Sequence, residues 1–99
     1  MNVLNRDKVI SYLEEFKRKN RKKYHILKLG LFGSFTRNEM NEHSDIDIVV
    51  ELEKPKMFDI IGIKQELEEA FTCPVDIVRM RRNMNTFLKD RIEREAIFV

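Results

Sequence analysis

Apolar residues recur at two different periods along the chain, and the period separates the expected helices from the expected strands. Spacings of three and four residues predict amphipathic helices, whereas alternating or continuous apolar runs predict strands. The expected helices span about 5–19, 35–39, 57–71 and 84–96, and the expected strands span 24–32, 45–52 and 75–80. This order predicts a small α/β (α+β) sheet with helices packed against it, formed by one domain over residues 1–99.

The same periods assign individual side chains to the core or to the surface. Asn5 or Asp7 is expected to cap the first helix. In the first strand, one face is expected to present Leu27, Leu29 and Leu31, and the other Ile26, Lys28, Gly30 and Phe32. In the helix at 57–71, the buried stripe is expected to comprise Ile60, Ile63, Leu67, Ala70 and Phe71, with Lys64, Glu66, Glu68 and Glu69 facing outward.

Two carboxylates and a glycine–serine pair lie where the first two strands meet their turns. Alternation places Asp45 and Asp47 on one face of the second strand. Carboxylates this close repel each other unless a cation lies between them, and Mg²⁺ prefers such oxygen ligands together with substrate phosphates. Gly33 lets a phosphate approach the backbone at the start of a helix, and Ser34 adds a hydroxyl donor. These residues predict metal-assisted transfer of a phosphoryl or nucleotidyl group.

Segments 33–37 (Gly-Ser-Phe-Thr-Arg) and 44–48 (Ser-Asp-Ile-Asp-Ile) resemble the motif of the DNA polymerase beta-like nucleotidyltransferase superfamily. The short branch of that superfamily, the minimal nucleotidyltransferases, is the most similar, and the likeness extends over nearly the whole chain. It implies a mixed sheet of the polymerase palm type and a third carboxylate on a later strand, where Asp76 stands. The common motif reads Gly-Ser-x-Ala-Arg-Gly, whereas Thr36 and Asn38 occupy its Ala and second Gly positions here. Because Asn tolerates positive φ, the turn is expected to survive.

The resemblance implies a role for each of these residues. Asp45 and Asp47 are expected to bind two Mg²⁺ ions, with Asp47 bridging both, and Mn²⁺ would suit the same oxygens. Asp76 is expected to complete the second metal site and to accept the proton of the attacking hydroxyl. Gly33 and Ser34 are expected to bind the β and γ phosphates of ATP, so that pyrophosphate leaves.

Arg37 and a basic cluster in the first helix each allow two interpretations. Arg37 is expected either to contact the triphosphate or to hold Asp or Glu side chains in place, and the alternative is a surface ion pair. The cluster at 17–23 contains six cations around one Asn. It is expected to be a solvated helix C-terminus whose charge complements the helix dipole, and the alternative is a docking patch for an acidic partner or RNA.

Composition restricts the classes of partner and compartment. Charged residues make up 36% of the chain, above the usual share of about 25%, which predicts a heavily charged surface. The net charge is only +2, so direct nucleic-acid binding is not expected. Cys73 is the single cysteine, which excludes an intrachain disulfide and suits a reducing cytoplasm. We expect a soluble cytoplasmic protein, since the sequence shows neither a secretory signal nor an apolar run of about 20 residues.

The resemblance leads to three candidate functions. Members of the minimal branch are often encoded beside a HEPN-domain ribonuclease toxin and resemble antitoxins that adenylylate a tyrosine on it, as in a type VII toxin–antitoxin pair. The leading expectation is therefore transfer of AMP from ATP to a protein hydroxyl of a HEPN partner within a hetero-oligomer. The alternative is a non-catalytic antitoxin that neutralises the toxin by binding. A third candidate function is transfer to a small hydroxyl compound, as in aminoglycoside nucleotidyltransferases. So short a chain, however, has few residues with which to form a pocket around a sugar.

Overall fold

The computed structural model describes residues 4–37, 45–54 and 56–99. The elements in order are α1 (Arg6–Tyr24), β1 (Ile26–Phe32), the 3₁₀ helix η1 (Gly33–Arg37), β2 (Ile46–Leu52), α2 (Met57–Phe71), β3 (Val75–Arg79), α3 (Thr86–Glu95) and β4 (Ile97–Phe98). The strands form one sheet in the order β3-β2-β1-β4. Strand β1 is antiparallel to β2 and β4, and β3 is parallel to β2. The predicted mixed sheet with packed helices is confirmed.

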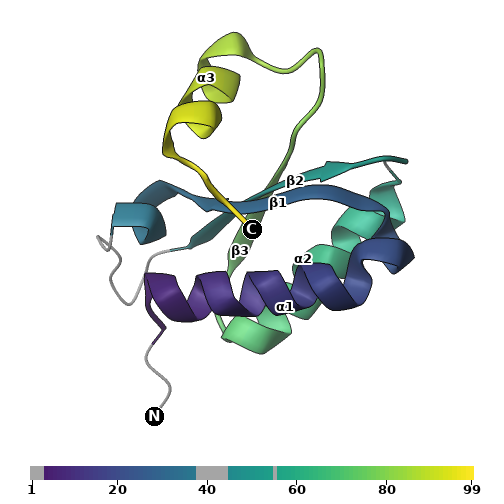
Figure 1. The fold of residues 1–99 in the computed structure, drawn as a ribbon, viewed down its shortest axis with the longest axis vertical. Helices are drawn as coiled ribbons and strands as arrows, with labels where there is room; N and C mark the ends of the chain where they lie inside the picture. The colour runs from purple at the N-terminus through teal and green to yellow at the C-terminus, as the bar shows by residue number, and fades with distance from the viewer. Residues whose placement is uncertain (1–3, 38–44, 55) are drawn as a thin grey trace.

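Helices cover both faces of the sheet. Figure 1 shows α1 and α2 on one face and α3 on the other. The larger hydrophobic cluster includes Val9, Leu13, Ile63 and Leu67 from the helices with Leu29, Leu31, Ile46, Ile48 and Val50 from the strands. The smaller cluster, on the α3 face, is formed by Phe32, Val49 and Ile92. Since neighbouring strand residues point to opposite faces, Asp47 lies on the face that α3 covers, as the alternation predicts.

Helix α1 extends to Tyr24, so its predicted end near Lys19 is wrong. Asn5 caps the first turn by accepting from the Lys8 backbone N–H (2.9 Å). Lys and Arg are good helix formers, so the basic cluster at 17–23 continues the helix, and its last turn places three cations near the negative end of the dipole. Buried Tyr24 then anchors the C-terminus, and His25 ends the helix with φ 55°.

The Tyr24 hydroxyl donates to Glu66 on α2. Burial and this carboxylate raise the pKa of Tyr24 to about 12, so the donor proton remains at neutral pH. Tyr24→Phe is expected to lower the free energy of unfolding by about 1 kcal/mol in denaturant titrations near pH 7. The difference should shrink as pH rises from about 10 to 12, where the unfolded tyrosine ionises before the folded one. Tyr12→Phe is the matched control, and an equal loss in that variant would contradict the prediction.

The expected faces of β1 are wrong at its first two residues. Ile26 is 1% exposed and packs in the larger core with Leu29 and Leu31, whereas Leu27 is 49% exposed. The pairing of β1 with β2 has an irregularity between Ile26 and Lys28, which shifts the alternation by one residue there. Sequence periodicity assumes an unbroken strand and therefore misassigned this pair.

Helix α2 has the predicted bounds, but two glutamates on its polar face form hydrogen bonds to other elements. Besides the bond from Tyr24 to Glu66, the Glu68 carboxylate accepts from the Val75 backbone N–H (3.0 Å) and so fastens α2 to β3. Ala70 of α2 is exposed, so its place in the predicted buried stripe is wrong. Phe87, which helical spacing in the segment 84–96 also assigns to an apolar face, is 88% exposed on α3. Strand β4 was not predicted, because two residues are too few to show a period.

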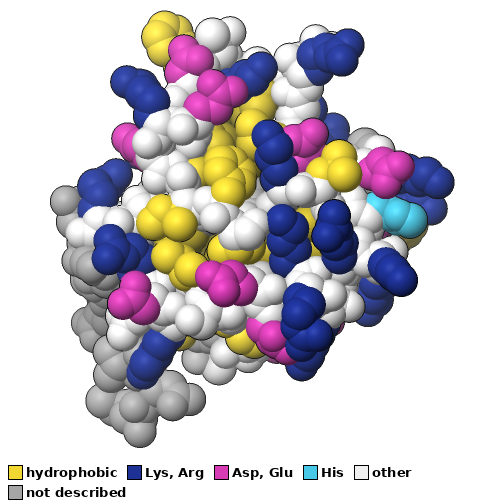
Figure 2. All heavy atoms as spheres, viewed as in Figure 1, with side chains coloured by type: hydrophobic (Ala, Val, Ile, Leu, Met, Phe, Trp, Pro, Cys, Tyr) yellow, Lys and Arg dark blue, Asp and Glu magenta, His cyan; other side chains and the backbone are white. Residues whose placement is uncertain are grey.

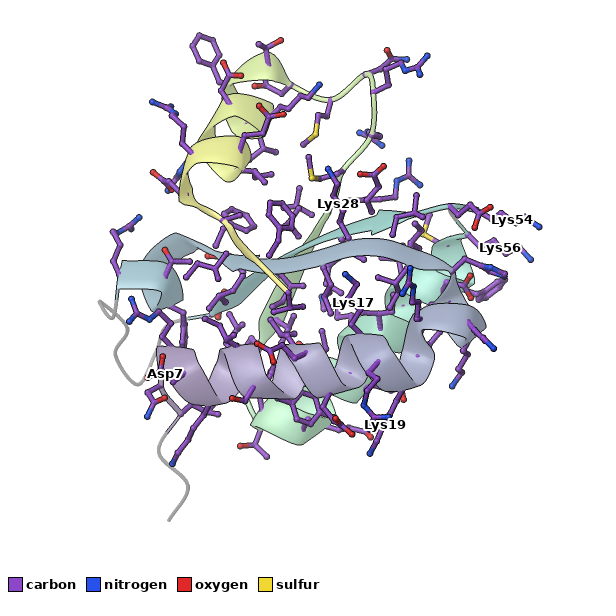
Figure 3. All side chains as sticks on the ribbon, in the orientation of Figure 1. Asp7, Lys17, Lys19, Lys28, Lys54 and Lys56 are labelled. Atoms are coloured by element: carbon purple, nitrogen blue, oxygen red, sulfur yellow. The ribbon has the colours of Figure 1, made fainter. Side chains whose placement is uncertain are left out.

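Charge is distributed unevenly along the sheet. Strand β2 begins directly after Asp45, and Glu53 and Lys54 follow its end. Helix α1 ends with Arg21, Lys22 and Lys23 near that second end, because Ile26 pairs with Leu52. In Figure 3, Lys54 and Lys56 lie at the end opposite Asp7, and Figure 2 shows Lys and Arg side chains gathered on that side.

Among the helices of residues 4–37, 45–54 and 56–99, none combines the length and the hydropathy that a membrane span requires.

Candidate active site

Gly33 and Asp47 are in direct contact at the end of β1. Gly33 has φ +83°, and a Cβ placed on it would lie 2.2 Å from the Asp47 Oδ2 atom. Glycine adopts this backbone conformation without strain, and because it has no Cβ it leaves this space to the Asp47 carboxylate. The pairing of Phe32 with Asp47 across β1 and β2 sets the contact. A larger residue at the turn would therefore displace the Asp47 side chain.

Parallel pairing of β2 with β3 places the predicted carboxylate Asp76 beside Asp47. Asp47 on β2 is the register partner of Asp76 on β3, and Asp45 precedes Asp47 by two residues at the start of β2. Burial, followed by the negative charges of Asp76 and Asp45, raises the pKa of Asp47. The structure thus brings Gly33, Asp47 and Asp76 together, with Asp45 near enough for its charge to act on Asp47.

The donor set of this site suits a hard divalent cation. Its acidic groups are carboxylates, and their mutual repulsion is the condition that a cation relieves. Within residues 4–37, 45–54 and 56–99, however, no three His, Cys, Asp or Glu side chains are arranged so that they could hold a metal ion together as they stand. The chemistry of the residues fits a metal, and the side chains would have to turn toward it.

The raised pKa of Asp47 predicts an effect of pH on stability. The folded protein holds this proton more tightly than the unfolded chain, so in metal-free buffer the free energy of unfolding should fall as pH rises from about 4 through the raised pKa. Asp47→Asn should therefore have a higher Tm than wild type at pH 7 in chelator, and added Mg²⁺ should narrow the difference. Thermal scans check this, with exposed Asp90→Asn as the control. A lower Tm for Asp47→Asn in chelator would contradict it.

The turn after Gly33 differs from the expected short helix at 35–39. It is a 3₁₀ helix that begins at Gly33 itself, and Ser34 lies half-buried in its first turn. The Thr36 hydroxyl donates to the Gly33 carbonyl oxygen (2.6 Å), which braces the turn. Thr36, which departs from the common motif, therefore has a structural use here. Asn38, the other departure, lies outside the described residues, as does Ser44 of the second motif segment.

Helix α3 adds two residues to the edge of the site that sequence reasoning missed. Arg37 of η1 forms an ion pair with Glu95 of α3 (3.7 Å), and Arg91 contacts the same carboxylate (3.1 Å). The Arg91 guanidinium also lowers the pKa of Asp47, against the larger effects that raise it. In the structure Arg37 thus takes part in an exposed ion pair, the alternative named for it, and its partner on α3 lies outside the predicted carboxylate set. Contact of Arg37 with a triphosphate stays a prediction. The four-residue spacing of Arg91 and Glu95 was the only available signal.

Comparison with known proteins gives a consistent result. The family described as "Nucleotidyltransferase domain" matches residues 12–99. The protein adenylyltransferase MntA of Thermococcus cleftensis is 30% identical over 100 residues, covering 100% of both chains. The solved structure of a candidate minimal nucleotidyltransferase is similar with a TM-score of 0.80 and 26% identity, covering 98% of each chain. A toxin–antitoxin crystal structure with AMP-PNP is similar with a TM-score of 0.72 and 27% identity, covering 96% of this chain and 72% of that one.

These matches confirm the resemblance drawn from the residues around Gly33 and Asp47, and with it the fold of the minimal branch. The family match covers far more than half of the chain, and the MntA relative matches from end to end. The glycine turn and the carboxylates described above lie within the matched range. The chain therefore belongs to the nucleotidyltransferase domain family.

Proposed function

We propose that this protein transfers AMP from ATP to a hydroxyl of a HEPN-domain ribonuclease toxin, most simply a tyrosine, and thereby acts as its antitoxin. The contact between Gly33 and Asp47, with Asp76 in register beside it, is the observation that supports this most strongly. The MntA relative is a protein adenylyltransferase, and a structural neighbour comes from a crystal structure of a toxin–antitoxin pair with AMP-PNP. Both support ATP as the donor and a protein as the acceptor.

Each residue of the site has a chemical task in this proposal. Gly33 leaves room for the Asp47 carboxylate and would bind the β and γ phosphates through its backbone, and Ser34 would present its hydroxyl to the same phosphates. The acceptor oxygen forms a new bond to the α phosphorus while the bond from that phosphorus to the bridging oxygen breaks, so pyrophosphate leaves. Asp76, the more exposed neighbour of Asp47, would take the hydroxyl proton.

Asp45, Asp47 and Asp76 would hold Mg²⁺ or Mn²⁺, which when bound supplies charge neutralisation for the phosphates and a lower proton affinity for the attacking hydroxyl. Without such a cation, the carboxylates would repel the triphosphate that Gly33 and Ser34 are to bind. Arg37 then offers a fixed positive charge at the same edge. Positioning and electrostatics, rather than a covalent enzyme intermediate, would produce the rate.

The test incubates the purified protein with ATP, Mg²⁺ and its HEPN partner, and then measures the intact mass of the partner. A gain of one or more AMP units, located on a hydroxyl by peptide mapping and abolished by chelator, is the expected result. A tight complex without added mass would overturn catalysis and leave an antitoxin that acts by binding. An unrelated protein in place of the partner is the control, and it should gain no mass.

A further inference from the structure

One carboxylate oxygen at the edge of the site is shared by two arginines from different elements. The Glu95 Oε2 atom lies 3.1 Å from Arg91 Nε and 3.7 Å from Arg37 Nη1. Arg91 and Glu95 stand one helical turn apart on α3, whereas Arg37 ends η1, the turn that begins at Gly33. A pair within one helix would stabilise α3 by itself, but it does not account for the ion pair to η1.

Packing fixes this part of α3 against the catalytic face. Ile92 is fully buried against Phe32 and Val49, and Phe32 is the register partner of Asp47. Directly after α3, β4 pairs with Gly30 and Leu31 of β1, which ties the C-terminal end of the helix to the strand that leads into Gly33. The Arg91 charge accordingly acts on Asp47. Arg37 ends the 3₁₀ turn that begins at Gly33, and Arg91 shares its carboxylate partner, so both guanidinium groups lie beside that turn.

The ion pairs of Glu95 are of a kind that exchanges easily. The side chains of Arg37, Arg91 and Glu95 are 43%, 53% and 37% exposed, and ion pairs at such exposure are weak. A triphosphate carries more negative charge than one carboxylate, and its oxygens accept the same bidentate guanidinium hydrogen bonds. A nucleotide tail at Gly33 and Ser34 would thus compete successfully for the same two cations.

We propose that Glu95 acts as an internal stand-in for the phosphates, holding Arg37 and Arg91 at the edge of the site until the triphosphate of the nucleotide replaces it. Arg91 is then a second phosphate-binding arginine, supplied by α3 rather than by the glycine turn. Glu95 is a positioning residue that competes with substrate. The inference rests on the proposed function, because it requires that this site bind a nucleoside triphosphate.

Isothermal titration with ATP and Mg²⁺ tests the inference independently of turnover. Glu95→Gln removes the competing charge while keeping the shape, and it should tighten ATP binding by about threefold. Arg91→Ala should weaken ATP binding by about tenfold. Arg94→Ala, on the same helix, is the matched control and should bind ATP as wild type does. With AMP in place of ATP, the effects of Glu95→Gln and Arg91→Ala should shrink, because most of the phosphate charge is missing.

The opposite signs of the two effects separate competition from a purely structural role. If Arg91 and Glu95 only stabilised α3, both variants would lower Tm and neither would change ATP affinity, which would overturn the inference. Weaker ATP binding in Glu95→Gln would also overturn it, since Glu95 would then assist rather than compete. If wild type itself bound no ATP, the proposed function would fail as well. If wild type bound ATP and both variants bound it with the same affinity, the inference about Glu95 would be refuted while the proposed function would stand.

Discussion

Replacing Asp47 by Asn is expected to reduce AMP transfer to the HEPN partner by about a hundred- to a thousandfold or more. Asp47 is the carboxylate that touches Gly33, pairs in register with Asp76 and is affected by the charge of Asp45. The amide keeps the shape of the side chain but removes the negative charge that a metal ion requires. The initial rate of mass gain of the partner, at saturating ATP and Mg²⁺, measures the effect.

The same substitution should not damage the fold, because it also removes a charge that the folded state disfavours. A lost rate with an unchanged or higher Tm in chelator would therefore separate chemistry from stability. Asp90→Asn, an exposed change on α3, is the activity control and should transfer AMP at the wild-type rate. Retained transfer in Asp47→Asn would remove this carboxylate from the catalytic account.

Gly33→Ala has the second large expected effect. The new Cβ would lie 2.2 Å from the Asp47 carboxylate oxygen, and φ +83° is unfavourable for alanine. We expect a loss of about 1–3 kcal/mol in the free energy of unfolding, from backbone strain and displacement of a neighbour. Because the displaced neighbour is Asp47, transfer should also fall by about a hundredfold, the cost of misplacing a group by about 1 Å. Chemical denaturation and the mass assay measure the two effects.

Gly62→Ala is the matched control for that change. It lies within α2, and its new Cβ would come 3.0 Å from the Tyr24 hydroxyl oxygen, far less close than at Gly33. Alanine also favours a helix interior, so stability should change by no more than about 1 kcal/mol and transfer should remain. Equal losses of transfer in both variants would show that general destabilisation, rather than contact with Asp47, is responsible.

The site was more predictable from sequence than its surroundings, for a physical reason. The period of two in a strand fixes the face on which Asp47 and Asp76 point, and a glycine that leaves an apolar strand marks a turn. Those local rules place Gly33 and Asp47, whereas the membership of Asp76 was implied by the family resemblance, and parallel pairing of β2 with β3 brings it beside Asp47. The chemical roles of these residues remain predictions that the assays above address.

Several of the misses depended on tertiary contacts. Leu27 is exposed because strand pairing is irregular, and the helix passes Lys19 because Tyr24 is anchored in the core beyond it. Glu95 meets Arg37 only because α3 packs on Phe32 and Val49. No period along the chain encodes contacts between such distant residues, so a sequence pattern could not reveal them.

Because charged groups are placed unevenly along the sheet, the net charge of only +2 does not describe the field that a molecule meets near either end of β2. The carboxylates lie where β2 starts, whereas Lys54 and the last turn of α1 lie where it ends. An approaching charged molecule would consequently experience a torque before it touches the surface, so collisions would be biased in orientation. Salt should erase this bias first, because the screening length at physiological ionic strength is only about 8 Å.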